Sequence, residues 1–262
     1  MMDITVSIIF HKEAAFAVPA LASMKLLVST ARSAGLAVEA HALLDNADKL
    51  TTHIVGQHGA WLDAIRHVAH GDLGLTRNTG TQQAAGDYLA FIDGDDLWGA
   101  AWLTGAHTQA RQEAAASRSI WHPDSIFYFY ESDFDRHSTD RFARADPKSY
   151  HLHHRPSDAQ GFNANALFLD NLWTANIFAH RGIYERFPYK ALNRDLGLGI
   201  EDWSWNIETY SAGIAHRTVP DTVHLIRVKE AGSLGQSNQS SGLLPYLPDY
   251  AFPALGTNKG AR

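Results

Sequence analysis

Short apolar runs typical of buried strands alternate with longer stretches of helical spacing over the first hundred residues. The runs are rich in β-branched residues, whereas the longer stretches place apolar residues three and four positions apart. The predicted strands are 4–10, 36–44, 62–68 and 88–92, and the predicted helices are 19–34 and 75–85. This alternation predicts an α/β protein with a mostly parallel central sheet, flanked by helices and joined by right-handed crossovers.

The stretch Gly71–Trp98 joins a helix, a buried strand and an acidic turn. In the helix, Thr76, Gly80 and Ala84 recur every four positions, so that small side chains share the face on which the helix can approach a sheet. The strand that follows delivers Asp93-Gly94-Asp95-Asp96 to its carboxyl end, which is where ligands bind in open α/β sheets.

The three carboxylates of this turn repel one another unless a positive group lies among them. A hard divalent cation, Mg²⁺ or Mn²⁺, would suit them, because such ions take oxygen ligands and commonly bridge one or two carboxylates to a substrate diphosphate. The same residues also suit a polar turn that closes a hairpin. That alternative does not account for the Arg77-Asn78 pair upstream.

Together these pieces resemble the family-2 glycosyltransferases of the GT-A fold. The family's pattern is roughly Ala-Arg-Asn-x-Gly, then Ala-x-Gly, then an apolar strand that ends in Asp-x-Asp-Asp. The matching residues, in the same order and spacing, are 76–80, 84–86 and 91–96. The resemblance covers about 4–238 and implies a GT-A-like domain over 1–238, followed by a C-terminal tail at 239–262.

The resemblance implies a nucleotide-sugar donor, a divalent cation (Mn²⁺ or Mg²⁺) and a single displacement that inverts the configuration at the sugar carbon. Asp95 would coordinate the ion, and Asp93 would contact the nucleotide ribose or share the ion. His224, in the C-terminal segment, is the candidate for a further metal ligand. Arg77 or Arg227 would help to neutralise the charge on the departing nucleoside diphosphate.

Phe10, His11 and Asp45 are further candidates for donor binding. Phe10 and His11 end the first strand, where the family usually carries Pro-Thr-Tyr-Asn, and His11-Lys12-Glu13 departs from that pattern. Asp45 ends the second strand and matches an acid that lies near the nucleotide base in the family. Taken alone, an Asp-Asn pair after a strand is usually only a turn.

Glu201-Asp202 is a second chemical feature, at the start of a predicted helix that Gly197 and Gly199 precede. Two acids in a first turn are a normal arrangement, since the helix dipole stabilises them. The pair also resembles the family's Glu-Asp motif, in which the Asp serves as catalytic base. The helix N-terminus favours the ionised carboxylate, so we expect Asp202 to deprotonate the acceptor hydroxyl.

The rest of the chain continues the α/β pattern less regularly. The predicted elements are a helix at 99–117, one or two strands within 119–130, a short strand at 176–179, a helical turn at 181–186 and two strands around a proline turn at 216–229. Residues 133–162 are polar and include a histidine cluster at 151–154. A metal site there would need ligands fixed by a framework, so we expect a loop that folds over the acceptor. Residues 232–238 predict another loop, which orders on donor binding.

Composition bears on the partners and the cellular location that we expect for the protein. The net charge of −6 gives no reason to expect nucleic-acid binding, and the chain has no cysteine. The N-terminus lacks the plan of a signal peptide, and no continuous run of about 18 apolar residues occurs. We expect a soluble cytoplasmic protein without a transmembrane segment, compatible with peripheral membrane association. Its acceptor would be a saccharide or a lipid-linked molecule, as in polysaccharide or glycolipid synthesis.

Two other functions stay open. A GT-A-like nucleotidyltransferase would use the same fold and ion, but should carry a Gly-rich loop with Arg or Lys after the first strand, where this chain has His-Lys-Glu-Ala-Ala at 11–15. A non-catalytic nucleotide- or carbohydrate-binding protein would need no base, and Glu201-Asp202 argues against it.

Overall fold

The computed structural model describes residues 2–113, 117–134, 147–229, 238 and 240–247. The strands are β1 Met2–Phe10, β2 Val38–Asp45, β3 Ala64–Val68, β4 Gly86–Asp93, β5 Leu97–Trp98, β6 Ser119–Phe129, β7 Tyr150–His153, β8 Phe178–His180, β9 Leu198–Gly199, β10 Ala215–Arg227 and β11 Leu244–Pro245. The helices are α1 Ala17–Ser33, α2 Lys49–His58, α3 Leu73–Gln82, α4 Trp102–Gln112, α5 Glu131–Phe134, α6 Arg181–Arg186 and α7 Glu201–Ser211, with the 3-10 helices η1 Ala14–Phe16 and η3 Ala164–Phe168.

A nine-stranded sheet forms the centre of the molecule, in the order β3-β2-β1-β4-β8-β6-β10-β5, with β7 paired beside β6. The strands β3, β2, β1 and β4 are parallel to their neighbours, and β6 is parallel to β10. The short strands β5, β7 and β8 run antiparallel to the strands beside them. The mostly parallel α/β sheet predicted from the sequence is confirmed.

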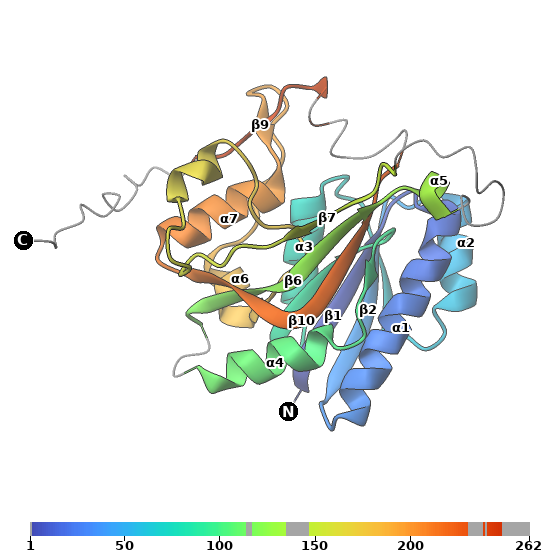
Figure 1. Ribbon diagram of the computed structural model, residues 1–262. Helices are drawn as coiled ribbons and strands as arrows, with labels where there is room; N and C mark the ends of the chain where they lie inside the picture. The colour runs from blue at the N-terminus through green and yellow to red at the C-terminus, as the bar shows by residue number, and fades with distance from the viewer. Residues whose placement is uncertain (1, 114–116, 135–146, 230–237, 239, 248–262) are drawn as a thin grey trace, which may run out of the picture.

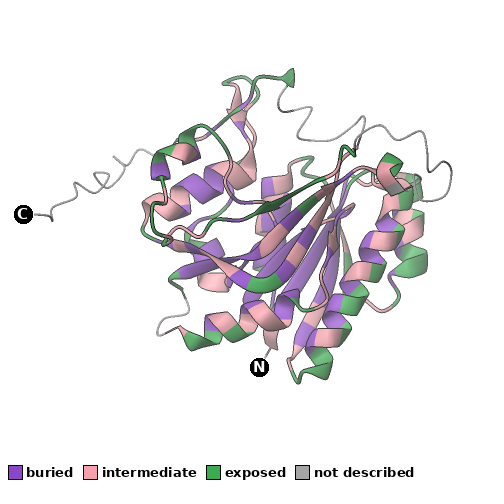
Figure 2. Ribbon diagram, viewed as in Figure 1, coloured by how far each residue is buried: buried purple, intermediate pink, exposed green. Residues whose placement is uncertain are grey.

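Helices cover both faces of the sheet (Figure 1). Because side chains alternate along a strand, Ile4, Val6 and Ile8 of β1 pack in one apolar cluster with α1, α2 and α4. Ile9 belongs to a second cluster, formed with residues of α6 and α7 on the other face. The central strands are therefore buried on both sides, as Figure 2 shows.

The helix Ala14–Ser33, which combines η1 and α1, is long enough to cross a membrane, and its mean hydropathy of 1.5 would also suffice. Polar residues such as Ser23 and Lys25 interrupt it, which is why the sequence has no continuous apolar run of that length. In the fold this helix packs on the sheet, through Leu21, Met24 and other buried residues. A core helix has the same properties, so length and composition alone do not indicate a membrane span.

Helix α2 and strand β10 differ from the sequence prediction. The helix α2 was not predicted, because β-branched residues and Gly56 weaken its pattern; the available signal was Asp48, whose carboxylate accepts a hydrogen bond from Thr51 N at 2.7 Å. β10 is one strand where two were predicted. Its register shifts between Val219 and Val223, so a bulge accommodates the proline between them.

Part of the predicted C-terminal tail packs on the domain. β11 pairs in parallel with β9, and Tyr246 N donates a hydrogen bond to Ser204 Oγ of α7 at 2.9 Å. The predicted loop 133–162 is described at 133–134 and 147–162, where strand β7 pairs with β6 instead of remaining loop. Residues 135–146, nearly all of the loop 232–238 and the tail beyond residue 247 lie outside the described residues.

Candidate active site

A cleft of about 660 Å³ lies at the carboxyl ends of β1, β2 and β4, with the end of β10 on its other side. The chain passes from β1 to β2 on one side and returns to β4 on the other side of β1, which is the switch point where open α/β sheets bind ligands. Of the residues predicted for donor or metal binding, the cleft brings together His11, Asp45, Asp93, Asp95 and Arg227.

Each aspartate of the acidic turn has its own partner within the protein. Asp93 Oδ1 lies 3.0 Å from Arg77 Nη2, and Asp95 Oδ2 lies 2.5 Å from Lys229 Nζ. Asp96 Oδ2 lies 2.9 Å from His224 Nε2. The partners of the three carboxylates therefore come from two distant parts of the chain, helix α3 and the segment at the end of β10.

Gly94 allows the acidic turn to lie directly on β1. A Cβ atom at this position would meet Phe10 Cδ1 at 2.4 Å and the Ile9 carbonyl oxygen at 2.5 Å. Phe10 was predicted to bind the donor, but its side chain is fully buried beneath the turn and does not line the cleft. Its role in this structure is to support the turn.

Arg77 also lies beneath the cleft rather than on its surface. Its side chain is fully buried, and Nη1 donates to Glu201 Oε1 at 2.8 Å while Nη2 donates to Asp93. Burial by itself would lower the pKa of Arg77, but the carboxylates of Asp93 and Glu201 outweigh it and raise the pKa. The expectation that Arg77 contacts the donor directly is not supported by this arrangement. It joins the acidic turn to the start of α7.

His224 has a structural partner at each ring nitrogen. Nε2 bonds to Asp96, and Nδ1 lies 3.4 Å from Thr174 Oγ1. The ring is buried and does not line the cleft, which argues against its predicted role as a metal ligand. Burial raises the pKa of Asp96 to about 6, although the contact with His224 acts in the opposite direction.

Asp45 organises the loop that closes one side of the cleft. Its carboxylate accepts hydrogen bonds from the backbone N–H groups of His70 and Gly71, each at 2.8 Å, and of Asp72 at 3.1 Å. Thr76 Oγ1 donates a fourth at 2.8 Å. With its oxygens used in this way, Asp45 positions the loop, and its predicted contact with the nucleotide stays a prediction.

His11 borders the cleft beside this loop, and Nδ1 lies 2.7 Å from the carbonyl oxygen of Asp45. Its backbone N–H donates to Glu13 Oε2 at 2.5 Å. Burial raises the pKa of Glu13, which also lines the cleft. His11, Lys12 and Glu13, which depart from the family pattern after the first strand, therefore line the cleft.

The Glu201-Asp202 pair begins α7, as predicted. The residue before it, Ile200, has a φ of 57°, a left-handed conformation that costs energy for a β-branched residue. Asn171 Nδ2 donates to Asp202 Oδ2 at 2.9 Å, and Trp203 N donates to Oδ1 at 2.8 Å. Enclosure and the neighbouring Glu201 nevertheless raise the pKa of Asp202 to about 7.

Asp202 does not line the main cleft, but the start of α7 adjoins it. A side cavity of about 60 Å³ shares Gly71, Asp72 and Arg194 with the cleft and reaches Glu201. On the other side, Tyr128 of β6 pairs in register with Ile226, which lines the cleft. Asp202 and Asp96 both contribute to the raised pKa of the Tyr128 phenol.

The chemistry of the cleft suits a divalent ion only in part. Asp93 and Asp95 present carboxylate oxygens to the cleft, as Mg²⁺ or Mn²⁺ requires. Among the residues that the structure describes, no group of three His, Asp or Glu side chains could hold an ion alone. An ion held by these two aspartates would need further oxygen ligands. The predicted histidine cluster forms no such group either; His153 pairs with Asp124 at 3.2 Å and His154 is buried.

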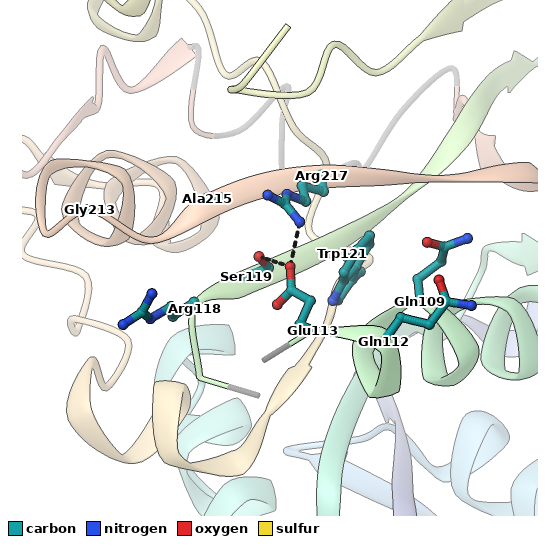
Figure 3. Close-up of a pocket in the computed structure, with 9 residues that line it drawn as sticks. All are labelled: Gln109, Gln112, Glu113, Arg118, Ser119, Trp121, Gly213, Ala215 and Arg217. Atoms are coloured by element: carbon teal, nitrogen blue, oxygen red, sulfur yellow. Dashed lines mark hydrogen bonds and ion pairs between the residues drawn. The ribbon is translucent and has the colours of Figure 1, made fainter. Parts of the chain in front are cut away.

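A second cavity, of about 460 Å³, lies near the beginnings of β6 and β10, at the opposite end of these strands (Figure 3). Two of its charged groups, Glu113 and Arg217, already pair with each other. Glu113 Oε1 accepts hydrogen bonds from Arg217 Nη1 and Ser119 Oγ, each at 2.6 Å, and Arg217 Nε lies 3.0 Å from Asp158. This cavity has no connection with the predicted motifs, and we assign the site to the first cleft.

Sequence reasoning missed several residues of the cleft. Lys12 and Arg194 line it, and Lys229 pairs with Asp95 across it. Arg194 stands in an irregular segment with no pattern around it. Lys229 follows β10, two residues after Arg227, and the sequence placed it only behind the candidates His224 and Arg227.

Fold and cleft together define an α/β protein of the GT-A type, with an acidic turn at its ligand-binding edge. The family model described as glycosyl transferase family 2 matches residues 5–168, more than half of the chain. The chain belongs to this family, which confirms the class expected from its motifs. No curated protein matches the sequence.

Solved structures of glycosyltransferases share the fold. The S. aureus TarS 1–349 structure is similar with a TM-score of 0.56 and 14% identity, over 86% of this chain and 60% of that one. TarS 1–349 in complex with UDP-GlcNAc matches with a TM-score of 0.56 and 13% identity, over 88% and 60%. The mannosyltransferase PcManGT from Pyrobaculum calidifontis, in complex with GDP-Man and Mn²⁺, matches with a TM-score of 0.57 and 14% identity, over 88% and 58%. The chain thus spans about 60% of the TarS fragment.

Proposed function

We propose that this chain is a metal-dependent, inverting glycosyltransferase that moves a sugar from a nucleotide-sugar donor to an acceptor hydroxyl. One observation carries the proposal. The buried Arg77 bonds to Asp93 of the acidic turn and to Glu201 beside Asp202, at 3.0 and 2.8 Å. Arg77 thereby fixes the position of the acidic turn, which is expected to bind the donor, relative to Asp202, which is expected to activate the acceptor. A single displacement requires the two to be held in this way.

Donor binding is assigned to the 660 Å³ cleft. Asp93 and Asp95 would hold Mn²⁺ or Mg²⁺, and the ion, when bound, would stabilise negative charge on the departing nucleoside diphosphate. Arg227 and Lys229 line the same cleft and supply further positive charge near that position. The presence of UDP-GlcNAc and of GDP-Man with Mn²⁺ in the similar structures supports this assignment.

Asp202 is the proposed general base. Its carboxylate removes the proton of the acceptor hydroxyl while the acceptor oxygen bonds to the sugar carbon and the bond to the diphosphate breaks on the opposite face. A pKa of about 7 leaves much of Asp202 ionised near neutral pH and strong enough as a base to take that proton. The acceptor is a saccharide or a lipid-linked molecule, and we propose a cytoplasmic site of action.

A donor screen tests the proposal. UDP-, GDP- and dTDP-sugars, each with Mn²⁺ or with EDTA, should raise the melting temperature only for the correct nucleotide and only with Mn²⁺, because a ligand that binds the folded state stabilises it by mass action. The same donor should be hydrolysed slowly to a nucleoside diphosphate. Formation of a nucleoside triphosphate and a sugar 1-phosphate when pyrophosphate is added would instead indicate a nucleotidyltransferase, and the absence of any donor effect would contradict the proposal.

A further inference from the structure

The ion pair between Lys229 and Asp95 occupies the position that the proposed divalent ion needs. Lys229 Nζ lies 2.5 Å from Asp95 Oδ2, and both residues line the cleft. The side chains are only 17% and 18% exposed, so water screens their attraction weakly. An ion at Asp95 Oδ2 would compete with this ammonium group for the same oxygen atom.

The surroundings hold Lys229 close to the turn. Its ammonium lies 5.5 Å from the centre of the Phe16 ring, a distance suited to a cation–π contact. Asp95 and Lys229 both act electrostatically on the carboxyl group of Glu13. Two residues earlier, Arg227 N donates to Asp96 Oδ1 at 3.0 Å and Arg227 Nε donates to the carbonyl oxygen of Asp95 at 3.2 Å. The end of β10 is thus bound to the acidic turn through both backbone and side chains.

We infer that Lys229 is the counter-ion of Asp95 in the donor-free protein and that it must exchange with the divalent ion when the donor binds. The inference rests on the proposed function, because it takes Asp95 as a metal ligand. A donor diphosphate would give the displaced ammonium a new anionic partner in the same cleft. Ion and nucleotide therefore bind cooperatively, and the ion alone binds weakly, because it must displace Lys229 without compensation.

Binding of Mn²⁺ alone to the metal-free chain tests the inference. Lys229→Met keeps the aliphatic chain and removes the charge, so affinity for Mn²⁺ without nucleotide should rise at least about tenfold. Titration calorimetry, or the paramagnetic resonance signal of free Mn²⁺, gives the dissociation constant. The control is Lys12→Met, which removes the same charge from an exposed lysine of the same cleft and should change the constant much less.

Adding UDP or GDP completes the test. In the unmodified chain the correct diphosphate should increase Mn²⁺ affinity strongly, and in Lys229→Met this increase should be several-fold smaller. Asp95→Asn combined with Lys229→Met should lose the gained affinity, which assigns the ion to Asp95. Unchanged or weaker Mn²⁺ binding by Lys229→Met, alongside nucleotide-dependent binding in the unmodified chain, would overturn the exchange alone. Absence of Mn²⁺ binding in every variant, with either nucleotide, would overturn the proposed metal dependence and the exchange with it.

Discussion

The guanidinium of Arg77 is fully buried beneath the cleft and has carboxylates at 3.0 and 2.8 Å from its two terminal nitrogens. If such a buried cation is removed, its two carboxylate partners lose their counter-charge, and the folded state is destabilised. The expectation from the sequence was that Arg77 contacts the donor, and the structure instead makes it the connection between two motifs 124 residues apart. Its loss should therefore affect folding first.

Arg77→Met should lower the free energy of unfolding by about 3–5 kcal/mol, because Asp93 and Glu201 would be left without their buried counter-charge. Urea denaturation at pH 7.5 measures the change. Arg181→Met is the control, since Arg181 forms a half-exposed pair with Glu185, and should cost less than about 1 kcal/mol. Similar losses of unfolding free energy in the two variants would mean that Arg77 contributes no more to stability than an exposed ion pair does.

Asp202→Asn should reduce the rate of transfer by about 10²–10⁴-fold while donor affinity stays close to that of the unmodified chain. Because the ionised form is the base and its pKa is about 7, activity of the unmodified chain should rise with pH up to about 7 and then level off. The exposed carboxylate of Asp170 offers a control, and Asp170→Asn should keep the rate. Transfer by Asp202→Asn at the normal rate would mean that the base lies elsewhere.

Glu201 cannot serve as a simple control for Asp202. Its carboxylate binds Arg77 at 2.8 Å, so Glu201→Gln weakens the link to the acidic turn as well as changing the charge beside the base. We therefore expect Glu201→Gln to lower stability as well as activity.

At the scale of elements, Gly80 leaves no room for a side chain between α3 and the sheet. A Cβ atom there would approach Phe91 Cε1 to 2.7 Å and Leu43 Cδ1 to 2.9 Å. The spacing of small residues predicted this close packing from the sequence. The contact matters for the site, because α3 carries both Arg77 and Thr76, which bond to the acids of the cleft.

Gly80→Ala should destabilise the fold by about 1–3 kcal/mol, since the added methyl group overpacks the contact between helix and sheet. The matched control is Gly56→Ala in α2, where nothing lies within 4 Å of the added atom. That change should stabilise by about 0.5–1 kcal/mol through helix propensity. Opposite signs in thermal or urea unfolding would support the close approach, and a stabilising effect of both substitutions would refute it.

At the scale of the whole molecule, a buried group of histidines joins the second half of the sheet to α7. His122 Nε2 lies 2.9 Å from His216 Nδ1, and His216 Nε2 lies 3.0 Å from Thr209 Oγ1 of α7. His154 is buried against His122 with the rings 5.3 Å apart. Burial lowers the pKa of His154 to about 4 and that of His216 to about 3, and it also lowers the pKa of His122.

Stability should therefore fall by a few kcal/mol as the pH drops from about 6.5 to 4. The unfolded chain takes up protons on these histidines in that range, whereas the folded protein does not, so acid favours unfolding. Urea midpoints at pH 7.5, 6 and 5 measure the slope. His53→Gln removes an exposed histidine and should leave the slope unchanged, whereas His122→Phe should reduce it. The raised pKa values of Asp202 and Asp96 act in the opposite direction, so the comparison of variants is the decisive measurement. Equal pH slopes in the unmodified chain and in His122→Phe would contradict the buried, neutral state of the group.

Much of the fold was open to prediction. The strands β1, β2 and β4 and the helices α1 and α3 follow from periodicity, because burial on one or both faces imposes a repeat within a few residues. The helix α2 was missed because its residues disfavour helices locally and packing overrides that preference. β10 was divided in two because a proline usually interrupts a strand, whereas here a bulge absorbs it.

The sequence by itself determined the family, the order of the main elements and the presence of acids at the end of β4 and the start of α7. These features depend on spacing within short segments, so each can be recognised without the rest of the chain. Only the tertiary structure decided which side chain pairs with each acid. Asp96 meets His224 across 128 residues, and Arg77 meets Glu201 across 124. Such pairs form where strand order and helix packing bring distant segments together, and no local pattern encodes that meeting.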